Sequence, residues 1–580
     1  MRISKNWILI AIVVLGAAVR FWGLAFCLSF GAGDYGVVPY CRLDEELIWK
    51  AALGFFSGDL NPHFFTYPTL LPYSLALLDA IYLAGKFLLE ARGSVEALKQ
   101  NIVMNPSDLV LLGRGWVALL GSTTLILVYQ MAKKLFDGTT GLLSAFFLAF
   151  AYLHVRDSHF ATADVPMTFM VCTAYLFIIR ILQHGAWPDY LLAGLFSGLA
   201  ISTKWNAFPV IFPILLADAL RLRKENDPER AILNVKLFAS LSIVPLAVIL
   251  GTPSLLLSPH ECIESLRALS RIHARKYSLP VISHLNGPVY HFKFSLWYGL
   301  GWPLFLASLA GIGVALKKNW KAGLLLLGFV LPYYFIISRR DLVFMRYMIP
   351  VIPFCAIFAG VFVVQFCRFI HPSPHPSPHP SPLRGEGRVR GIFMIILSLF
   401  IATPSLYRIY WLDQQLTKLD SRLEAGRWIR ENIPANASLL LLSLISGDPA
   451  IPLQEAQIWD LDIPLRVEWP LKFFKTKPFV DAYRPERVIP DMYWQKRNNL
   501  AAGKYDFIIA DYSPLPVRSI TPRMLDDLKK HFFLVREFRG VGDHPGMIFD
   551  WQHGFYVPVA GAQFAERPGP NIYIFKQKIK

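Results

Sequence analysis

The chain has 580 residues, of which 54% are hydrophobic and 17% are charged, and its mean hydropathy is +0.41. A soluble globular protein would carry about a quarter charged residues, so the composition excludes an ordinary soluble protein. The formal net charge of +17 could indicate nucleic-acid binding. However, the basic residues lie largely in short loops between apolar segments, so membrane topology explains the charge more simply, and we expect no nucleic-acid partner.

Apolar runs long enough to cross a bilayer recur along the N-terminal two thirds of the chain. A spanning helix needs about 20 apolar residues to cross a hydrocarbon core roughly 30 Å thick. In lipid only helices and closed barrels satisfy their backbone polar groups, and these runs have helical lengths. They predict about eleven transmembrane helices, two of them a tight pair of shorter segments. The predicted spans are residues 7–28, 109–131, 139–156, 164–183, 189–202, 205–220, 233–257, 293–316, 321–338, 343–368 and 391–411.

The first apolar run follows Arg2 and Lys5 and has some features of a signal peptide. A retained anchor is favoured, because no small-residue cleavage site follows it. The six cysteines of the chain are scattered, without the spacing of a metal site. Cys27 and Cys41 would lie on the same outer side of the membrane, where they can form a disulfide, although the sequence leaves this pairing open.

The run 67–90 decides the predicted orientation of the chain. It contains Pro68, Pro72 and Asp79, which suit an interfacial or re-entrant helix better than a span. If this run does not span and the N-terminus is cytoplasmic, almost every strongly basic short loop lies inside, as the positive-inside rule expects. We therefore expect a multi-pass protein of the cytoplasmic (inner) membrane. The exception is the pair Arg339–Arg340, which stays outside, and an anionic ligand would account for it.

The character of the chain changes near Trp411. Residues 413–432 have leucines at helical spacing and predict an amphipathic helix. Strands are predicted at residues 438–445, 505–510, 532–537 and 571–575. With an odd number of spans this α/β domain lies outside.

The predicted fold is therefore mainly α: a polytopic membrane domain over residues 1–411 and an extracytoplasmic α/β domain over 412–580. Residues 371–390 are a low-complexity, Pro-rich segment that we interpret as a cytoplasmic linker. His375 and His379 repeat within it; metal binding is conceivable there, but a repeat insertion is the favoured interpretation.

Two acidic positions fall on the predicted outer face. Asp44 and Glu45 lie in the first outer loop, and paired acids beside a membrane are costly unless they are solvated or used. A solvated loop with ordinary acids is the alternative. The second position, Asp164, begins the 164–183 span. It could simply cap that helix, with Pro166 in the first turn.

Several cations are predicted on the same face. Lys204 lies between two short helices, where it could extend its ammonium group to the membrane surface or bind a lipid phosphate. The other cations are Arg114, Arg339, Arg340 and Arg346. Carboxylates combined with cations suit a reaction that has a negatively charged leaving group and a hydroxyl or amine nucleophile.

Taken in chain order, these residues resemble the membrane glycosyltransferases of the GT-C class, specifically the protein O-mannosyltransferase-like group, which includes the bacterial aminoarabinose transferase of lipid A. The resemblance covers roughly residues 7–411, except for the 371–390 insertion, and the Asp44–Glu45 pair is its most specific part. The resembling segments are Arg20 to Leu24, Asp44–Glu45, Gly58 to Pro62 with Tyr67–Pro68, Arg114, Lys134 to Gly138, Arg156 to Asp164, Thr203–Lys204, and Arg346–Tyr347 with Pro350.

The resemblance implies an inverting transfer of a sugar from a polyprenyl-phosphate donor on the outer face. Asp44 would be the general base that takes the acceptor's proton, and a single displacement needs no carboxylate nucleophile. Glu45 and Asp164 would orient the acceptor or support Asp44. Lys204 and Arg346 would hold the departing lipid phosphate. Further candidates for contact with substrate or lipid phosphate are Arg339, Arg340, Arg114 and His159.

The resemblance leaves the sugar and the acceptor open. The acceptor could be a protein, lipid A, another glycolipid or a surface polymer. Some relatives use a divalent metal, but the sequence contains no Asp-x-Asp pair or ligand cluster that requires one.

Two other functions remain possible from the sequence. A transporter or flippase of lipid-linked sugars would also need cations near the membrane face and polar groups within helices. The sequence shows no internal two-fold repeat, which weighs against a transporter. The third hypothesis is a non-catalytic assembly protein with a partner-binding outer domain. Substitution of Asp44 separates the three, because only an enzyme loses turnover.

Overall fold

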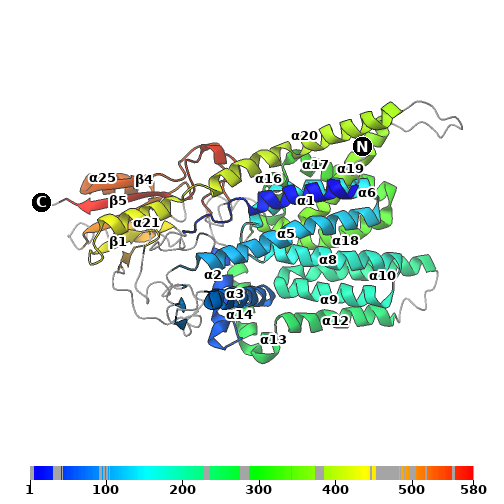
Figure 1. Cartoon of the computed structure of the whole chain (residues 1–580), viewed down its shortest axis with the longest axis horizontal. Coiled ribbons are helices and arrows are strands. Elements are labelled where there is room, and N and C mark those ends of the chain that lie inside the picture. Colours follow the sequence, from blue (N-terminus) through cyan, green and yellow to red (C-terminus); the bar gives the residue numbers. More distant parts are fainter. Residues whose placement is uncertain are drawn as a thin grey trace. The chain divides into compact units, whose positions relative to one another are not determined.

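The computed structural model (Figure 1) divides into two compact units. The first comprises residues 1–21, 65–71 and 116–409, and the second 22–64, 72–115 and 410–580. The domain boundary expected at residue 411 stays a prediction. The residues that the structure describes are 5–29, 41, 43–63, 65–89, 94–95, 98–99, 102, 105–225, 234–274, 286–340, 343–371, 384–443, 447–451, 483, 485–488, 490–495, 505–515, 519–550 and 555–578.

The first unit is a helical bundle. Its helices are α1 (Lys5–Phe21), α6 (Gly138–Ala149), α7 (Tyr152–Asp157), α8 (Asp164–Gln183), α9 (Trp187–Thr203), α10 (Ile211–Glu225), α12 (Val235–Gly251), α13 (Ser254–Leu257), α14 (Pro259–Ala274), α15 (Gly287–Tyr290), α16 (Trp297–Leu300), α17 (Trp302–Lys318), α18 (Trp320–Ser338) and α19 (Ile352–Ile370). Short helical turns of other geometry are η2 (Trp205–Val210), η3 (His291–Leu296) and η4 (Met345–Val351). Three further helices, α3 (Leu70–Leu89), α5 (Ser107–Leu135) and α20 (Arg384–Leu416), have residues in both units.

The described residues contain seven helices that are long and apolar enough to cross a membrane, or eight if a bent pair counts as one span. The chain is therefore a multi-pass, mainly helical membrane protein, and the predicted fold class is confirmed. The number of about eleven spans stays a prediction. Helix α3 is itself among these seven helices. The assignment of residues 67–90 as non-spanning therefore stays a prediction. The orientation of the termini depends on that assignment and also stays a prediction.

Some helix boundaries differ from those predicted. The expected span 293–316 is not one straight helix: the chain bends by 112° between Gly287–Leu300 and Trp302–Lys318. Gly301, between them, has φ +79°, a conformation open to glycine because it lacks a Cβ. The expected helix 413–432 is also interrupted. Helix α20 ends at Leu416, and α21 (Ser421–Asn432) begins after Asp420, whose carboxylate accepts a hydrogen bond from the Arg422 amide as an N-cap.

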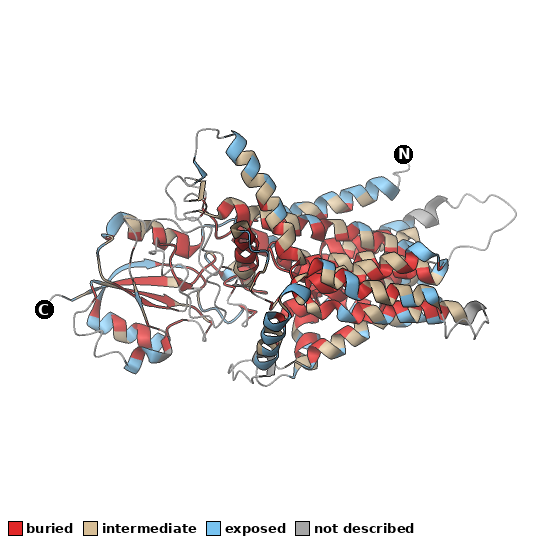
Figure 2. Ribbon diagram, turned by 90° about the horizontal axis from the view of Figure 1, so that it is seen from below, coloured by how far each residue is buried: buried red, intermediate tan, exposed pale blue. Residues whose placement is uncertain are grey.

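Small residues allow close helix packing in the first unit. A Cβ built on Gly194 of α9 would lie 2.3 Å from the Ser240 carbonyl oxygen of α12, and one on Gly311 of α17 would lie 2.0 Å from the Phe358 carbonyl oxygen of α19. Without a strong hydrophobic force between helices in lipid, such close backbone approach is a main source of association. Buried residues accordingly follow the facing sides of the bundle helices (Figure 2).

The second unit contains a five-stranded sheet of order β2-β1-β3-β5-β4. β1 is parallel to both β2 and β3, whereas β5 is antiparallel to β3 and β4. The strands are β1 (Leu439–Leu442), β2 (Glu486–Arg487), β3 (Phe507–Tyr512), β4 (Phe532–Phe538) and β5 (Asn571–Gln577). The four predicted strands are thus confirmed. The unit also contains α2 (Leu43–Gly54), α21, α25 (Pro522–His531) and the short turns η1 (Phe55–Ser57), η6 (Pro490–Met492) and η7 (Ala562–Phe564).

The sheet has a hydrophobic core on each face. Alternate residues of a strand point to opposite faces, so Leu440 packs in the core that includes Leu528 of α25, and Leu441 in the core that includes Ile429 of α21. Burial on both faces explains why β1 is a continuous run of leucine rather than an alternating pattern.

The α17–α19 contact predicts different effects for two neighbouring glycines. Gly311→Ala places a methyl group against the α19 backbone and should lower stability by about 1–3 kcal/mol. A Cβ built on Gly313 would meet nothing within 4 Å, so Gly313→Ala should be neutral or stabilise by up to about 1 kcal/mol through helix propensity. The measurement is thermal unfolding of the two variants in detergent; equal midpoints would contradict the packing.

Candidate active site

Asp164 lies in the first unit as the centre of a buried ionic group. Its Oδ1 is 2.6 Å from Lys204 Nζ, and its Oδ2 is 3.7 Å from Arg346 Nε. The three side chains are only 1%, 7% and 4% exposed, respectively. We call these three residues the ionic triad. Two cations face one carboxylate in this group, so the three residues together carry one net positive charge.

Interruptions of three helices position the triad. Asp164 is the first residue of α8, Lys204 has an extended backbone (φ −156°) between α9 and η2, and Arg346 lies in the 3₁₀ turn η4 that precedes α19. Each of the three residues thus lies at or near the end of a helix and not in its middle. Pro209 and Pro350 occur within the two short turns, where a regular α-helix would lose backbone hydrogen bonds.

Aromatic rings surround the cations. Lys204 Nζ lies 5.6 Å from the ring centroid of Tyr67 and 5.2 Å from that of Tyr347, and the Arg346 guanidinium lies 4.5 Å from that of Phe344. Rings at these distances attract a cation through their quadrupole, and they exclude water from it. Lys204 is only 7% exposed, so its positive charge interacts with an anion more strongly than it would in bulk water.

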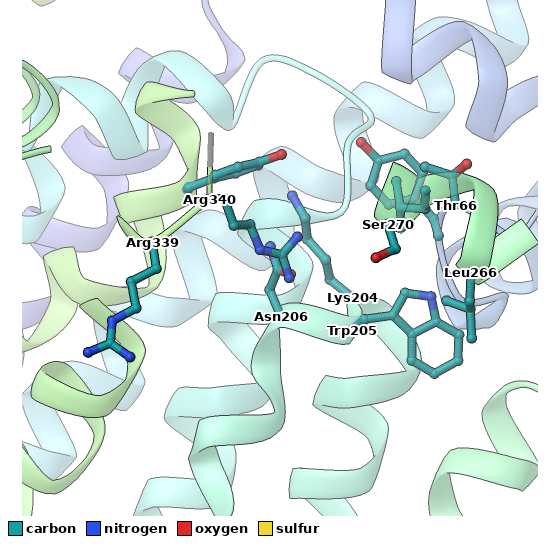
Figure 3. Close-up of a pocket in the computed structure, with 11 residues that line it drawn as sticks. Thr66, Lys204, Trp205, Asn206, Leu266, Ser270, Arg339 and Arg340 are labelled. Atoms are coloured by element: carbon teal, nitrogen blue, oxygen red, sulfur yellow. The ribbon is translucent and has the colours of Figure 1, made fainter. Parts of the chain in front are cut away.

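A cavity of about 520 Å³ opens beside Lys204 (Figure 3). One part of its wall is cationic or polar, with Lys204, Asn206 and Arg340, and another part is apolar, with Trp205 and Leu266. The remaining lining residues are Thr66, Tyr67, Leu269, Ser270, Arg339 and Tyr347. Asn206, Trp205 and the α14 residues were not predicted as site residues from the sequence, because nothing in their spacing connects them with Lys204.

In the second unit, Glu45 is held by Arg114. Arg114 Nε donates to Glu45 Oε1 at 2.8 Å and Nη2 to Oε2 at 2.7 Å, a two-bond pairing of guanidinium and carboxylate. Arg114 Nη1 also donates to the carbonyl oxygens of Leu24 and Phe26, and the guanidinium lies 3.8 Å from the Phe26 ring centroid. These contacts join the start of α2 to the chain after α1, so Glu45 and Arg114 fix the start of α2. Their predicted contacts with substrate stay predictions.

Asp44 precedes Glu45 in the first turn of α2, and its side chain is half-buried. Successive residues of a helix point in directions about 100° apart, so Asp44 and Glu45 lie on different sides of α2. A disulfide also joins Cys27, in the chain after α1, to Cys41, the pairing that the sequence left open.

The other predicted site residues lie in the first unit. Arg339 is exposed and Arg340 half-buried, and both line the cavity. His159 is fully buried, with Nδ1 2.9 Å from the Val155 carbonyl oxygen, and is not among the cavity-lining residues. Arg156 pairs with Asp157 at 2.8 Å. Within the described residues no group of three or more His, Cys, Asp or Glu is placed to hold a metal; His375 and His379 lie outside them.

Comparison with known proteins agrees with this fold. The sequence model of the family described as dolichyl-phosphate-mannose-protein mannosyltransferase matches residues 103–251, which include Asp164 and Lys204. Residues 103–251 thus carry the sequence signature of this family, and the chain is similar in fold to a solved GT-C membrane glycosyltransferase. The predicted resemblance is therefore confirmed. No curated protein sequence matches the chain significantly.

Solved GT-C structures resemble the chain at low sequence identity. ArnT from Cupriavidus metallidurans bound to undecaprenyl phosphate is 13% identical, with TM-score 0.50, over 99% of this chain and 98% of ArnT. The oligosaccharyltransferase AglB from Archaeoglobus fulgidus, in complex with an inhibitory peptide and a dolichol-phosphate, is 11% identical with TM-score 0.49, over 99% and 89% of the two chains. Against the apo form of the A. fulgidus enzyme the identity is 14% and the TM-score 0.45, over 73% of this chain and 58% of that one.

The Glu45–Arg114 pair predicts a non-additive effect on stability. Arg114→Met leaves a buried carboxylate without its cation and should cost about 3–5 kcal/mol. Arg114→Met combined with Glu45→Met removes both charges and should recover much of that loss. Thermal unfolding of the single and double variants in detergent measures this, with the exposed Arg267→Met as control. A double variant less stable than the Arg114 single variant would contradict a buried pair.

Proposed function

We propose that the chain is an inverting membrane glycosyltransferase that moves a sugar from a polyprenyl-phosphate donor to an acceptor on the outer face of the cytoplasmic membrane. The observation that carries this proposal is the ionic triad beside a cavity with one cationic and one apolar wall. Such a cavity suits a molecule that is anionic at one end and apolar at the other. A lipid phosphate has this character.

The triad supplies positive charge that stabilises the leaving group. In a single displacement, the acceptor oxygen or nitrogen bonds to the anomeric carbon while the bond from that carbon to the phosphate oxygen breaks. The oxygen keeps the electron pair, so the lipid phosphate leaves with one more negative charge than it had in the donor. Lys204 at the cavity wall stabilises this developing charge, and Arg346 adds to the local positive potential.

Asp164 holds the two cations in place before substrate arrives. Two buried cations without a counter-ion would repel each other and lose solvation, so the carboxylate between them fixes their positions. When a phosphate binds, Lys204 can bond to it while Asp164 still compensates part of the positive charge. This arrangement supports a role for Asp164 in positioning the two cations, whereas the resemblance implies that Asp164 orients the acceptor or supports Asp44.

Asp44 is the proposed general base. A positioned carboxylate takes the proton of the attacking hydroxyl or amine as the bond to the sugar forms. The GT-C resemblance supports this role, and so does the rigid anchoring of its neighbour Glu45 by Arg114. No covalent sugar–enzyme intermediate is required, so a second carboxylate nucleophile is unnecessary.

The donor class is supported by the matched family and by the ArnT structure, whose ligand is undecaprenyl phosphate. The acceptor is a hydroxyl or amine group on a protein, lipid A, another glycolipid or a surface polymer. Arg339, Arg340, Arg114 and His159 remain further candidates for contact with substrate or lipid phosphate. A divalent metal is compatible with the proposal but is not needed for any of its steps.

The proposal predicts the effect of Asp44→Asn on transfer. The assay uses purified protein in detergent, a panel of radiolabelled polyprenyl-phosphate sugars and membrane extract as acceptor pool. Wild type should label a product, and Asp44→Asn should reduce the rate by about 10²–10⁴-fold, because general base catalysis contributes that much. The exposed Asp526→Asn is a control for loss of one carboxylate.

The outcomes separate the hypotheses. Equal labelling by wild type and Asp44→Asn would remove Asp44 from the mechanism and leave Asp164 as the next residue to substitute. No labelling from any donor, with protein shown to be folded, would favour the transporter or flippase instead.

A further inference from the structure

A buried arginine at the start of α21 contacts the disulfide that lies between α1 and α2. Arg422 Nη2 lies 3.5 Å from Cys27 Sγ and 3.8 Å from Cys41 Sγ, and all three side chains are buried. These residues belong to one compact unit, because residues 22–64 group with residues 410–580. The disulfide therefore rests directly on the first turn of α21.

Asp420 fixes the direction of the Arg422 side chain. Arg422 Nε donates to Asp420 Oδ1 at 2.8 Å, and Nη2 donates to Oδ2 at 2.7 Å. Two such parallel bonds define the plane of the guanidinium as well as its position. Cys27 Sγ lies 3.4 Å from the same Oδ2, so the disulfide contacts both members of the ion pair.

Helix α21 is in turn attached to the sheet. Ile429 packs in the hydrophobic core on one face of the sheet. At the start of the helix, the Ser421 amide donates to the Pro568 carbonyl oxygen at 3.0 Å, and the Ser421 hydroxyl donates to that of Pro570 at 2.6 Å, immediately before β5. The position of Arg422 is therefore set by the sheet.

Two more contacts join this part of the unit to the chain that follows α1. Arg427 Nη2 of α21 donates to Ser29 Oγ at 3.2 Å. The ring of Phe26 meets that of Phe555 edge-on, with the centroids 6.0 Å apart. Because Arg114 of α5 also binds the carbonyl oxygen of Phe26, the chain after α1 is held by both α5 and α21.

The anchored disulfide is close in sequence to the proposed general base. Asp44 follows Cys41 by three residues, so at most about 11 Å of chain separates them. A general base acts only within hydrogen-bonding reach of the proton that it takes. A displacement of about 1 Å in a catalytic group lowers a rate by as much as about 10²-fold. The position of Cys41 therefore matters for transfer.

We infer that Arg422 is a positioning residue for the proposed general base. Together with Asp420 it anchors the Cys27–Cys41 disulfide on α21, and through the disulfide it fixes the start of α2, where Asp44 lies. This inference rests on the proposed role of Asp44. It gives the C-terminal sheet a part in the reaction, since the sheet sets the position of α21.

The first test removes this anchor without leaving a buried charge. We call the double substitution Asp420→Asn with Arg422→Met the anchor variant. It removes both charges of the pair, and asparagine also caps helices. In the transfer assay with full-length protein and the donor that labels a product, its kcat should fall by about 10–10²-fold. Its KM for the donor should change by less than about threefold, because the proposed donor site at Lys204 is unaltered.

Leu528→Ala is the control for a general loss of stability. Leu528 is fully buried in the core on the other face of the sheet, so its truncation weakens the sheet by creating a cavity. It leaves the contact between Arg422 and the disulfide in place. At a temperature where the variant is folded, its kcat should therefore stay close to that of wild type.

The second test determines whether Arg422 acts through Asp44. The anchor variant combined with Asp44→Asn should transfer as slowly as Asp44→Asn alone, because the effects of residues that act through one another are not additive. Arg422→Lys keeps a positive charge beside Asp420 and should retain more of the wild-type kcat than the anchor variant does. This single substitution keeps the test decisive if the anchor variant does not fold.

A third measurement does not depend on turnover. Hydrogen exchange of the full-length protein is followed at the amides of residues 47–50, which in a regular α-helix bond to the first turn of α2. The anchor variant should exchange there about tenfold faster than wild type, because the start of α2 has lost a support. Leu528→Ala should not change the exchange of these amides.

Slower transfer that disappears as a separate effect once Asp44 is substituted, together with faster exchange in α2, supports the inference. It is overturned if the anchor variant keeps the wild-type kcat, if Leu528→Ala loses as much, or if the losses of the anchor variant and Asp44→Asn multiply. If Asp44→Asn itself transfers at the wild-type rate, the proposed role of Asp44 is contradicted instead, so the two failures are distinguishable.

Discussion

The ionic triad of Asp164, Lys204 and Arg346 is the constraint on which the candidate site depends. Removing an ion from water costs several kcal/mol even after the protein relaxes, and here three ions are almost completely buried. Such a group persists only if its members are closely placed and supported. The interruptions between α9 and η2 and before α19 fix the backbone at Lys204 and Arg346, and aromatic rings cover the cations.

The two units hold their carboxylates in different ways. Glu45 uses both oxygens on Arg114, which also binds two backbone carbonyl groups, so this pair is satisfied within the protein. In the triad one carboxylate faces two cations, and the excess positive charge lies beside a cavity. The first arrangement fixes the start of α2, and the second places a cation at a cavity wall. The proposed roles, positioning for Glu45 and ligand binding for Lys204, rest on this difference.

The elements that depend on local pattern could be predicted from the sequence. The strands around Leu440 and Ile508 appear in the sequence as short apolar runs. Most of the helices in the bundle appear as long apolar runs. Lys204 was expected between two short helices and lies there. The bend at Gly301 and the cap at Asp420 were missed, because an apolar helical pattern continues through both. Glu45 pairs with Arg114, and α14 lines the cavity beside Lys204. Both contacts join residues that are far apart in sequence, so spacing along the chain could not predict them.

The position of the donor phosphate is the most direct test of the proposed mechanism. A cryo-electron microscopy structure of the full-length protein with undecaprenyl phosphate would reveal it. The phosphate should lie within hydrogen-bonding distance of Lys204 Nζ, about 2.7–3.2 Å, with the lipid chain leaving along the side of Trp205 and Leu266. A phosphate bound elsewhere, with the cavity beside Lys204 free of lipid, would contradict the proposed role of the triad.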